Sequence, residues 1–199
     1  MNDEIMIFST DIKPVRADAV RNRRRLLETA RRLFNRGEFD VITMSDIARE
    51  AGVGKGTLYR HFTDKAELCH ALLDEAMRDF QARTLERLSA PDSACEKLRW
   101  FLQESVRYVD QHMLLLREAA HQTAVGDFMV HPAHYWWRQT IRGLLEQLPV
   151  AGDLDYLADV LYVLLDVQML RFQRQSQGYS LERIQSGVIA TLDLLTRPG

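Results

Sequence analysis

Apolar side chains recur at helical spacing along most of the chain, and no stretch alternates as a half-buried β-strand does. Residues 17–36 contain no proline or glycine, and arginines occupy the positions between the apolar ones, which are Leu26, Leu27, Ala30, Leu33 and Phe34. Gly37 follows, and glycine is the usual left-handed stop of a helix. The pattern predicts an amphipathic helix over residues 17–36, preceded by a flexible arm over residues 1–16.

Two very short helices are predicted next. Thr43 can act as an N-cap, and Asp46 three residues later supplies the carboxylate of a capping box. Gly52 closes this helix after about two turns. A second piece of similar length, residues 55–62, follows the sequence GVG.

Longer helices are predicted over the rest of the chain. Asp64 and Glu67 form a D-x-x-E box, so a long helix begins here and continues to about residue 88. Ser180 is the expected cap of the last helix. The further helical stretches are residues 93–124 with a break near His112, residues 132–148, residues 154–175 and residues 181–196. The chain therefore predicts an all-α protein without internal repeats.

Charge is distributed unevenly along the 199 residues, although the net charge is only −2. Nine basic residues and two acidic ones lie between Lys13 and Arg36, whereas 14 basic and 18 acidic residues lie from Lys65 onward. A cationic segment joined to a mildly acidic body is typical of a polyanion-binding domain attached to a second domain. The alternative is a solvated, arginine-rich helix face.

No targeting or membrane segment is recognisable. The apolar patch IMIF near the start lacks the basic leader and the length of a signal peptide, and no later run has the roughly 18 apolar residues of a membrane span. Cys69 and Cys95 form neither a CxxC pair nor a disulfide framework. We expect a cytoplasmic protein that makes no membrane contact.

The stretch GVGKGT has the glycines and the lysine of a phosphate-binding loop, but its spacing is wrong for one. The residue five before Gly54 is Arg49, where the loop needs glycine, and Lys55 is followed by Gly56 rather than by a hydroxyl residue. Two short helices around a glycine turn instead fit a helix-turn-helix, whose second helix enters the major groove of DNA. Leu58 and Phe62, four residues apart, would then pack inward.

This segment resembles the TetR family of bacterial transcriptional regulators. The resemblance rests on LLETARRLFNRGEFDVITMSDIAREAGVGKGTLYRHFTDKAELCHALL, which includes A-x-x-L-F, I-A-x-x-A-G-V and L-Y-x-H-F-x-x-K-x-x-L, and it covers about a quarter of the chain. It implies a three-helix DNA-binding domain with a helix-turn-helix over residues 17–64, and a larger helical effector-binding and dimerisation domain over residues 65–199. The extension before Arg21 is longer than the family minimum and is either an arm that contacts the minor groove or a tail.

Carried over by position, the resemblance implies two sets of contacts with double-stranded DNA. The phosphate contacts are expected at Thr43, Ser45, Tyr59, His61 and Lys65. The base contacts are expected at Lys55, Gly56, Thr57 and Arg60. For individual residues the alternative is packing, as for Tyr59, or support of the turn, as for His61.

The last two predicted helices carry apolar stripes that are wider than one core-facing seam needs. Core packing alone is one interpretation, and the resemblance implies the other, an intersubunit four-helix bundle in a homodimer. The residues expected to form that interface are Leu157, Leu161, Leu164, Leu165, Met169, Ile184, Val188, Leu192 and Leu195.

Aromatic and polar residues are mixed in the middle of the chain, as in many apolar ligand cavities and also in ordinary helical cores. With the resemblance, this favours a small-molecule effector pocket lined by Trp100, Glu104, Tyr108, His121, His134 and Trp137. Histidines 112, 121, 131 and 134, near Glu118 and Asp127, could be interpreted as metal ligands. His131 and His134, however, lie on either side of Pro132 at a helix start, where histidine is often only a turn or surface residue, and no cysteine accompanies them, so we expect no metal and no cofactor. No catalytic spacing stands out, so we expect no enzyme.

The expected function is a ligand-responsive repressor that binds a palindromic operator as a homodimer and is released by a small-molecule effector. The alternative is a structural DNA-binding protein, such as a nucleoid or division factor, that needs no ligand. A fully packed second domain without a cavity would favour the alternative.

Overall fold

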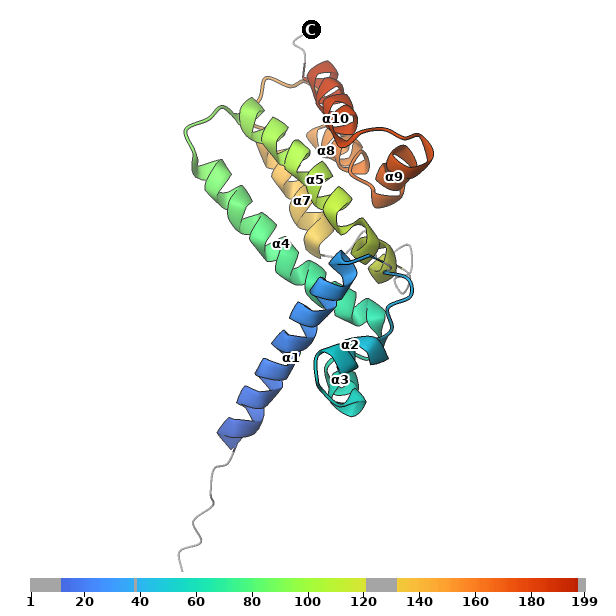
Figure 1. The fold of residues 1–199 in the computed structure, drawn as a ribbon. Coiled ribbons are helices and arrows are strands. Elements are labelled where there is room, and N and C mark those ends of the chain that lie inside the picture. The colour runs from blue at the N-terminus through green and yellow to red at the C-terminus, as the bar shows by residue number, and fades with distance from the viewer. Residues whose placement is uncertain (1–11, 38, 121–131, 197–199) are drawn as a thin grey trace, which may run out of the picture. The chain divides into compact units, whose positions relative to one another are not determined.

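The protein is described here from a computed structural model, which covers residues 12–37, 39–120 and 132–196. Within these residues all regular secondary structure is helical (Figure 1), which confirms the predicted fold class. The elements are α1 (Ile12–Asn35), α2 (Met44–Glu50), α3 (Lys55–His61), α4 (Lys65–Ser89), α5 (Ala94–Ala120), α7 (Pro132–Leu145), α8 (Leu154–Val163), α9 (Val167–Arg171), η1 (Phe172–Ser176) and α10 (Leu181–Leu195). The chain divides into two compact units, Met1–Leu68 and Cys69–Gly199.

The first unit packs α1, α2 and α3 against one another, each in contact with the other two. Its core is built from the apolar positions that the helical spacing predicted: Leu26, Ile47 and Leu58 are fully buried, and Leu27 and Phe62 nearly so. Each short helix contributes only a few such side chains. Helices of two turns are marginal alone, so tertiary packing and caps stabilise them.

Helix α1 begins at Ile12, five residues before the predicted start at Ala17. Pro14 lies within the first turn, where backbone amides have no helical acceptor and proline is tolerated. The remainder of the predicted arm, residues 1–11, lies outside the described residues. At the other end, Gly37 has a φ of 104°, as expected of a glycine that stops a helix.

The start of α4 differs in detail from the predicted box. The Asp64 carboxylate accepts a hydrogen bond from the Glu67 amide at 2.8 Å, as predicted. The Glu67 carboxylate, however, accepts from the amide and hydroxyl of Thr63, at 2.6 and 2.8 Å, rather than from the amide of Asp64. These bonds lower the pKa of Glu67, the Thr63 amide having the largest effect.

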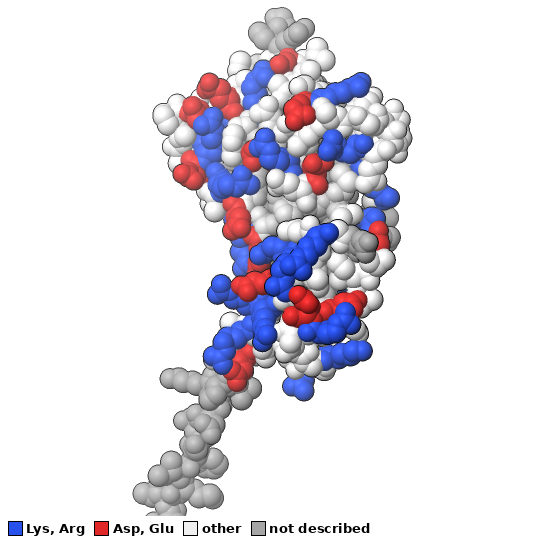
Figure 2. Space-filling model, viewed as in Figure 1, with Lys and Arg blue, Asp and Glu red and all other residues white. Residues whose placement is uncertain are grey.

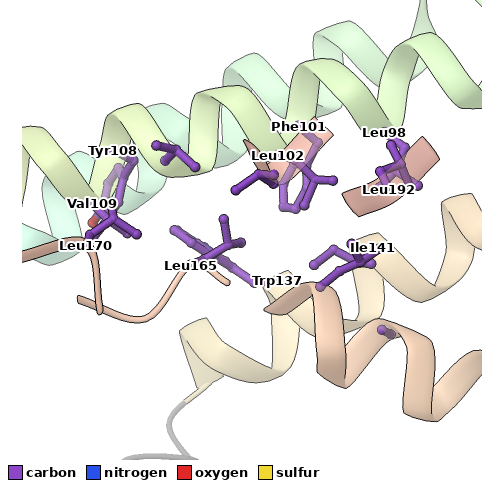
Figure 3. Packing of buried hydrophobic residues seen from close by; sticks show 14 of the residues in the cluster. Leu98, Phe101, Leu102, Tyr108, Val109, Trp137, Ile141, Leu165, Leu170 and Leu192 are labelled. Carbon is purple, nitrogen blue, oxygen red and sulfur yellow. The ribbon is translucent and has the colours of Figure 1, made fainter. Parts of the chain in front are cut away.

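The second unit is organised around α5, which contacts α7, α9 and α10. Side chains from these helices form its apolar core (Figure 3). An aromatic cluster lies within it: the ring of Phe80 from α4 stacks on Phe101 and Tyr108 of α5, with centroids 5.7 and 5.4 Å apart. Trp137 of α7 meets Phe80 edge to face at 5.6 Å. The four rings join three helices of this unit.

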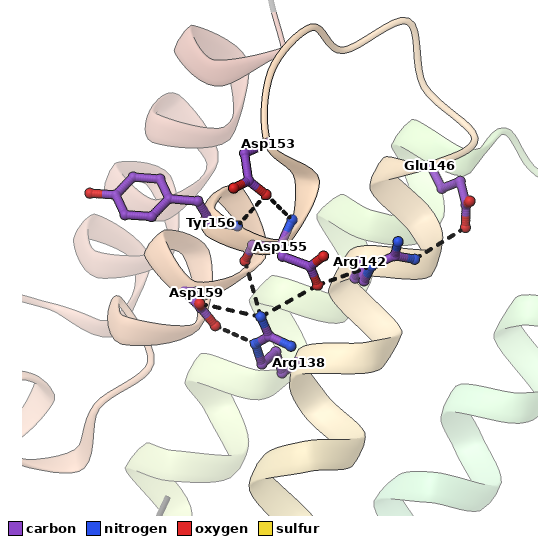
Figure 4. Close-up of polar contacts among 7 residues, drawn as sticks. All are labelled: Arg138, Arg142, Glu146, Asp153, Asp155, Tyr156 and Asp159. Atoms are coloured by element: carbon purple, nitrogen blue, oxygen red, sulfur yellow. Dashed lines mark hydrogen bonds and ion pairs between the residues drawn. The ribbon is translucent and has the colours of Figure 1, made fainter.

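Ion pairs on the outside of the unit join α7 to α8 (Figure 4). Arg142 of α7 pairs with Asp155 of α8 at 3.1 Å and with Glu146 at 3.4 Å. Arg138, one turn earlier, pairs with Asp159 and Asp155. Acidic residues on one helix therefore face arginines on the next, which fixes the register between α7 and α8.

Three predicted boundaries are wrong. Helix α5 continues through His112 without a break, because Val109 and Met113 on either side are buried in the core. Helix α7 ends at Leu145, before the predicted residue 148. The predicted helix over residues 154–175 is interrupted after Val163 and restarts at Val167, where Asp166 caps the new helix through the amides of the next two residues, and it then continues as a π-helical turn.

Candidate functional site

The helix-turn-helix begins with a complete capping box. The Thr43 hydroxyl accepts a hydrogen bond from the Asp46 amide at 3.2 Å, and the Asp46 carboxylate accepts from the Thr43 amide at 3.0 Å and hydroxyl at 2.6 Å. These bonds hold the pKa of Asp46 below its ordinary value, with the Thr43 hydroxyl as the largest cause. The box predicted from the sequence is thus confirmed, and it fixes where α2 starts.

The turn between α2 and α3 depends on Gly52. Its φ of +63° lies in the left-handed region, and a Cβ there would stand 3.0 Å from the guanidinium of Arg25. Gly56, by contrast, lies inside α3, where an added Cβ would meet nothing within 4 Å. The two glycines therefore have different reasons to be present: the first shapes the turn, and the second leaves open space on α3.

Helix α3 divides into a buried and an exposed face. Leu58 and the following cap residue Phe62 are anchored in the first unit, with 0% and 1% of their surface exposed. Lys55 and Arg60 are exposed, and Tyr59 keeps 49% of its surface exposed. Thr57 and His61 are half-buried. The exposed face carries the donors that a DNA-reading helix needs.

Lys65 differs from the rest of the predicted DNA contacts. Its ammonium donates a hydrogen bond to the backbone carbonyl of Phe39 at 2.5 Å. The same ammonium lies 4.0 Å from the centre of the Phe39 ring and 5.6 Å from the centre of the Phe34 ring. The side chain is half-buried. It therefore ties the start of α4 to the segment after α1. Of the other predicted contacts outside α3, Thr43 is exposed and Ser45 half-buried.

Arginines line the exposed surface of α1 (Figure 2), the positions being Arg21, Arg23, Arg24, Arg25, Arg31 and Arg32, and Arg36 follows directly after the helix. Some are paired, as Arg32 is with Glu50 at 3.0 Å. The Arg23 guanidinium lies 5.1 Å from the centre of the Phe62 ring and so covers the end of α3. The basic surface and the exposed face of α3 belong to the same unit.

The second unit contains a cavity of about 230 Å³. Its walls come from α4, α5, α7, α8 and the segment that leads into α9, and they are mostly apolar. The described lining residues are His70, Leu73, Asp74, Met77, Tyr108, Val109, Leu116, Ala119, Ala120, His134, Trp137, Tyr162, Val163, Leu165, Asp166 and Val167.

Three of the six predicted ligand residues line this cavity: Tyr108, His134 and Trp137. Glu104 does not, because it is buried against Arg83, at 2.8 Å, and Arg107. Trp100 packs on the apolar core instead. His121 lies outside the described residues.

Sequence reasoning missed the contribution of α4 and α8. His70, Asp74 and Met77 follow at helical spacing on one face of α4 and all line the cavity, as does Tyr162 of α8. The available signal was the pair of polar residues His70 and Asp74, four positions apart on one face of a largely apolar helix.

Hydrogen bonds hold the polar groups of the cavity in place. The Tyr108 hydroxyl donates to the Leu73 carbonyl at 3.4 Å, and burial, helped by the nearby Asp74 carboxylate, raises the pKa of this phenol. His134 Nδ1 is hydrogen-bonded to the Tyr162 hydroxyl, and the Trp137 indole N–H points to the sulfur of Met77 at 3.5 Å. The aromatic rings are thus oriented without a ligand.

Two further findings concern only the described residues. No three side chains of His, Cys, Asp or Glu among them are grouped so as to hold a metal ion, and His121, Asp127 and His131 fall outside that description. None of the helices in the described ranges is long and apolar enough to cross a bilayer.

An all-helical chain with a capped helix, a glycine turn and a short helix with an exposed polar face has the architecture of a helix-turn-helix protein. Residues 26–72 match the bacterial regulatory proteins of the tetR family. A helix-turn-helix transcriptional regulator of Staphylococcus aureus is 44% identical over 66 residues, which are 33% of this chain and 36% of that protein. The chain thus aligns with about a third of the length of such curated relatives. Residues 26–72 of this chain therefore form a helix-turn-helix domain of the tetR type, and the relatives that match it are transcriptional regulators.

Solved structures show the same fold over nearly the whole chain. A TetR-family transcriptional regulator from Pectobacterium atrosepticum has a TM-score of 0.68 at 23% identity, over 92% of this chain and 99% of its own. A protein from Saccharomonospora viridis in complex with choline has a TM-score of 0.69 at 23% identity, over 87% and 96%. The regulator FadR from Bacillus subtilis, in complex with stearoyl-CoA, has a TM-score of 0.65 at 18% identity, over 88% and 98%.

Proposed function

We propose that this chain is a ligand-responsive repressor that binds a palindromic operator as a homodimer in the cytoplasm and is released by a small-molecule effector. The observation that carries the DNA-binding part is the division of α3 into two faces. Leu58 and Phe62 anchor it, while Lys55, Tyr59 and Arg60 remain exposed. The lysine, tyrosine and arginine side chains on this face are hydrogen-bond donors of the kind that bind phosphates and base edges.

Within this proposal, base edges are read by Lys55, Gly56, Thr57 and Arg60, and phosphates are bound by Tyr59, His61, Thr43 and Ser45. Lys65 acts mainly through Phe39, so its contribution to DNA binding comes from positioning the start of α4. The arginines of α1 add a sequence-independent attraction to the backbone.

A homodimer follows from the geometry of operators, since a single short recognition helix reads only one half-site. The predicted interface residues divide into two groups. Five pack in the protomer's own core and are therefore unavailable to a partner: Leu161, Leu165, Ile184, Val188 and Leu192. Leu157, Leu164 and Leu195 are half-buried, and Met169 is 49% exposed.

The exposed apolar residues beside them are better candidates for the interface. Tyr156 of α8 and Leu194 of α10 keep 67% and 64% of their surface exposed. Val163, seven residues after Tyr156 on α8, keeps 60% exposed, although it also lines the cavity. Helices α8 and α10 contact each other. We infer that their outward faces form the contact between two protomers.

The cavity supports an effector. It is enclosed by several helices and lined by rings and a few polar groups, which is how small-molecule sites are usually built. Two proteins of the same fold were solved with choline and with stearoyl-CoA. Helix α4 starts at Lys65 and carries His70, Asp74 and Met77 into the cavity wall, so a ligand there would act on the helix that follows the DNA-reading unit.

The DNA-binding part is tested by selecting bound sequences from a random DNA pool and measuring affinity for the selected operator by fluorescence anisotropy. The variant Lys55→Ala/Tyr59→Ala should lose most specific binding, and Tyr135→Ala, which replaces an exposed tyrosine of the second unit, should not. Affinity should also fall steeply with added salt, because bound phosphates release counterions. Undiminished specific binding by the folded double variant would contradict the assignment.

The effector part is tested on the same complex by screening compounds for operator release. A ligand that binds the cavity and lowers operator affinity supports a responsive repressor. If every cavity ligand left operator binding unchanged, the alternative of a ligand-independent structural DNA-binding protein would be favoured.

A further inference from the structure

The permanently charged side chains among the described cavity-lining residues are all acidic. The described lining residues include two carboxylates, Asp74 and Asp166, and neither lysine nor arginine. The only side chains among them that can become cationic are His70 and His134. His134 is hydrogen-bonded through Nδ1 to the Tyr162 hydroxyl, and His70 lies one helical turn from Asp74 on α4. A ligand in this cavity therefore meets a negative electrostatic environment.

Asp74 is free to pair with a ligand. Its carboxylate takes part in no hydrogen bond or ion pair with another residue that the structure describes, and the residue is exposed, so it stands at the rim of the cavity. Its charge nevertheless acts inward, since it contributes to the raised pKa of the Tyr108 phenol on the facing helix. The nearest described cation in sequence, the Arg78 guanidinium, donates to the backbone carbonyl of Asp74 at 3.1 Å and not to its carboxylate. A carboxylate without an ion pair beside an apolar cavity attracts a cation.

Asp166, the residue that caps the start of α9, supplies a second carboxylate to the cavity wall. One of its oxygens, Oδ1, accepts both capping bonds, from the amides of Gln168 and Met169 at 2.9 Å each. The other carboxylate oxygen takes part in no hydrogen bond or ion pair with the described residues, and the side chain is half-buried. The cap fixes the carboxylate at the cavity wall while leaving half of it available.

Three aromatic rings form adjacent walls of the cavity at steep angles. Tyr108 and Trp137 meet at 73° with centroids 5.6 Å apart, and Trp137 and Tyr162 meet at 87° and 6.4 Å. Only 4% of the Tyr108 surface and 6% of the Trp137 surface are exposed. Rings set at such angles can present faces to one central group, and the face of an aromatic ring attracts a cation, most strongly for tryptophan.

We propose that the cavity binds a small organic cation, an ammonium or quaternary ammonium group attached to an apolar body. The rings of Tyr108, Trp137 and Tyr162 surround the apolar part and the cationic head, and Asp74 and Asp166 supply the counter-charge. This inference rests on the proposed effector site and names its ligand class. The ligands of the structural neighbours do not decide it, because choline is a cation and stearoyl-CoA an anion. The charges of this chain's own cavity do.

The test is a titration of the full chain, without DNA, by isothermal calorimetry. The probes are phenyltrimethylammonium, its uncharged carbon isostere tert-butylbenzene, and the anion 3-phenylpropanoate. The cation should bind at least tenfold more tightly than the isostere, and the anion more weakly than both. Saturable binding of the anion or the isostere as tight as that of the cation, or no cation binding at millimolar concentration, would overturn the inference.

Matched variants locate the charge. Asp74→Asn and Asp166→Asn remove one negative charge each without a change in size, and asparagine retains the cap at the start of α9. Each should weaken cation binding roughly three- to tenfold and leave the isostere unaffected, as expected when a partly exposed opposite charge is removed. The control Asp79→Asn, an exposed acid of α4 that is not in the cavity wall, should change neither. An unchanged preference for the cation in the Asp74→Asn/Asp166→Asn double variant would overturn the inference.

Operator release is measured separately, so the two proposals can fail independently. Cation binding that leaves operator affinity unchanged would keep the ligand class and overturn the effector role. Release caused by an anionic compound bound in the same cavity would keep the effector role and overturn the ligand class.

Discussion

The ammonium of Lys65 lies 2.5 Å from the backbone carbonyl of Phe39 and 4.0 Å from the centre of the Phe39 ring. The two residues are separated by 26 positions, so this contact closes the first unit from the start of α4 back to the segment after α1. The resemblance assigns Lys65 to DNA, whereas its position in the structure gives it a role in stability. The two roles make different predictions for its replacement.

Lys65→Ala should lower the free energy of unfolding by about 1–2 kcal/mol, because a charged hydrogen bond and a cation–π contact are lost together. Lys55→Ala removes an exposed lysine and should change stability by less than about 0.5 kcal/mol while reducing operator affinity. Urea denaturation and fluorescence anisotropy on both variants separate the roles. Equal stability losses in the two would contradict the structural role of Lys65.

Gly52 and Gly56 form a second matched pair. Gly52→Ala should cost about 1–2 kcal/mol, because its φ of +63° is unfavourable for alanine and the new methyl group would press on Arg25. Gly56→Ala should instead be neutral or stabilise by up to about 1 kcal/mol, since alanine is the better helix former and the site is open.

For operator affinity we expect the opposite ranking of the two glycine variants from the one expected for stability. We expect Gly56→Ala to weaken binding, because the added methyl group lies on the face of α3 that approaches DNA, whereas refolded Gly52→Ala should bind more nearly as the parent does. Thermal denaturation and anisotropy measure both effects. A Gly56→Ala variant with full affinity would show that this glycine is not at the DNA contact.

Local signals in the sequence predicted the first unit well. The Thr43 box, the Gly37 and Gly52 stops and the inward pair Leu58 and Phe62 all involve residues within a few positions of one another, so spacing alone reveals them. The break before α9 was missed for the opposite reason. Apolar spacing continues on both sides of it, and Asp166 has the same appearance in the sequence as any polar position on a solvated face.

The cavity and the dimer face could be predicted only in part, because both depend on how helices meet. Aromatic richness identified Tyr108 and Trp137, but the contribution of Asp74 required knowing which side of α4 faces α5. Similarly, the wide stripe on α8 indicated two apolar neighbours, yet it could not show that Leu161 faces the core and Tyr156 faces outward.

The Thr43 box predicts a pH dependence. The pKa of Asp46 is lowered in the folded protein, so its contribution to stability is fully present above its unfolded pKa of about 3.9 and is lost as the pH falls through the lower folded value. Thr43→Ala removes the largest cause of the shift. This variant should be less stable than the parent at pH 6, and the difference should shrink as the pH falls below about 4. Urea denaturation between pH 6 and pH 2.5 measures it, and a difference that grew on acidification would contradict this origin.

Glu104 provides a test of a residue that the sequence assigned to the ligand. Glu104→Gln should lower the free energy of unfolding by about 2 kcal/mol, because this buried carboxylate accepts from Arg83 and pairs with Arg107, although both arginines are partly solvated. Binding of phenyltrimethylammonium should be unchanged, since Glu104 does not line the cavity. A loss of ligand binding without a loss of stability would contradict this prediction and support the assignment of Glu104 to the ligand site.

The proposed interface makes the last prediction. Tyr156→Glu introduces a charge on the outward face of α8, where 67% of the tyrosine surface is exposed in the single chain. If a second protomer covers this face, burying the carboxylate is unfavourable and the protein should elute as a monomer. Operator affinity should fall as well, because a monomer contacts only one of the two half-sites. Leu85→Glu is the control, since this α4 residue is 61% exposed and lies away from α8 and α10 in sequence. Light scattering after size exclusion, with circular dichroism to confirm the fold, distinguishes the outcomes: a Tyr156→Glu variant with the parent's mass would place the dimer contact elsewhere.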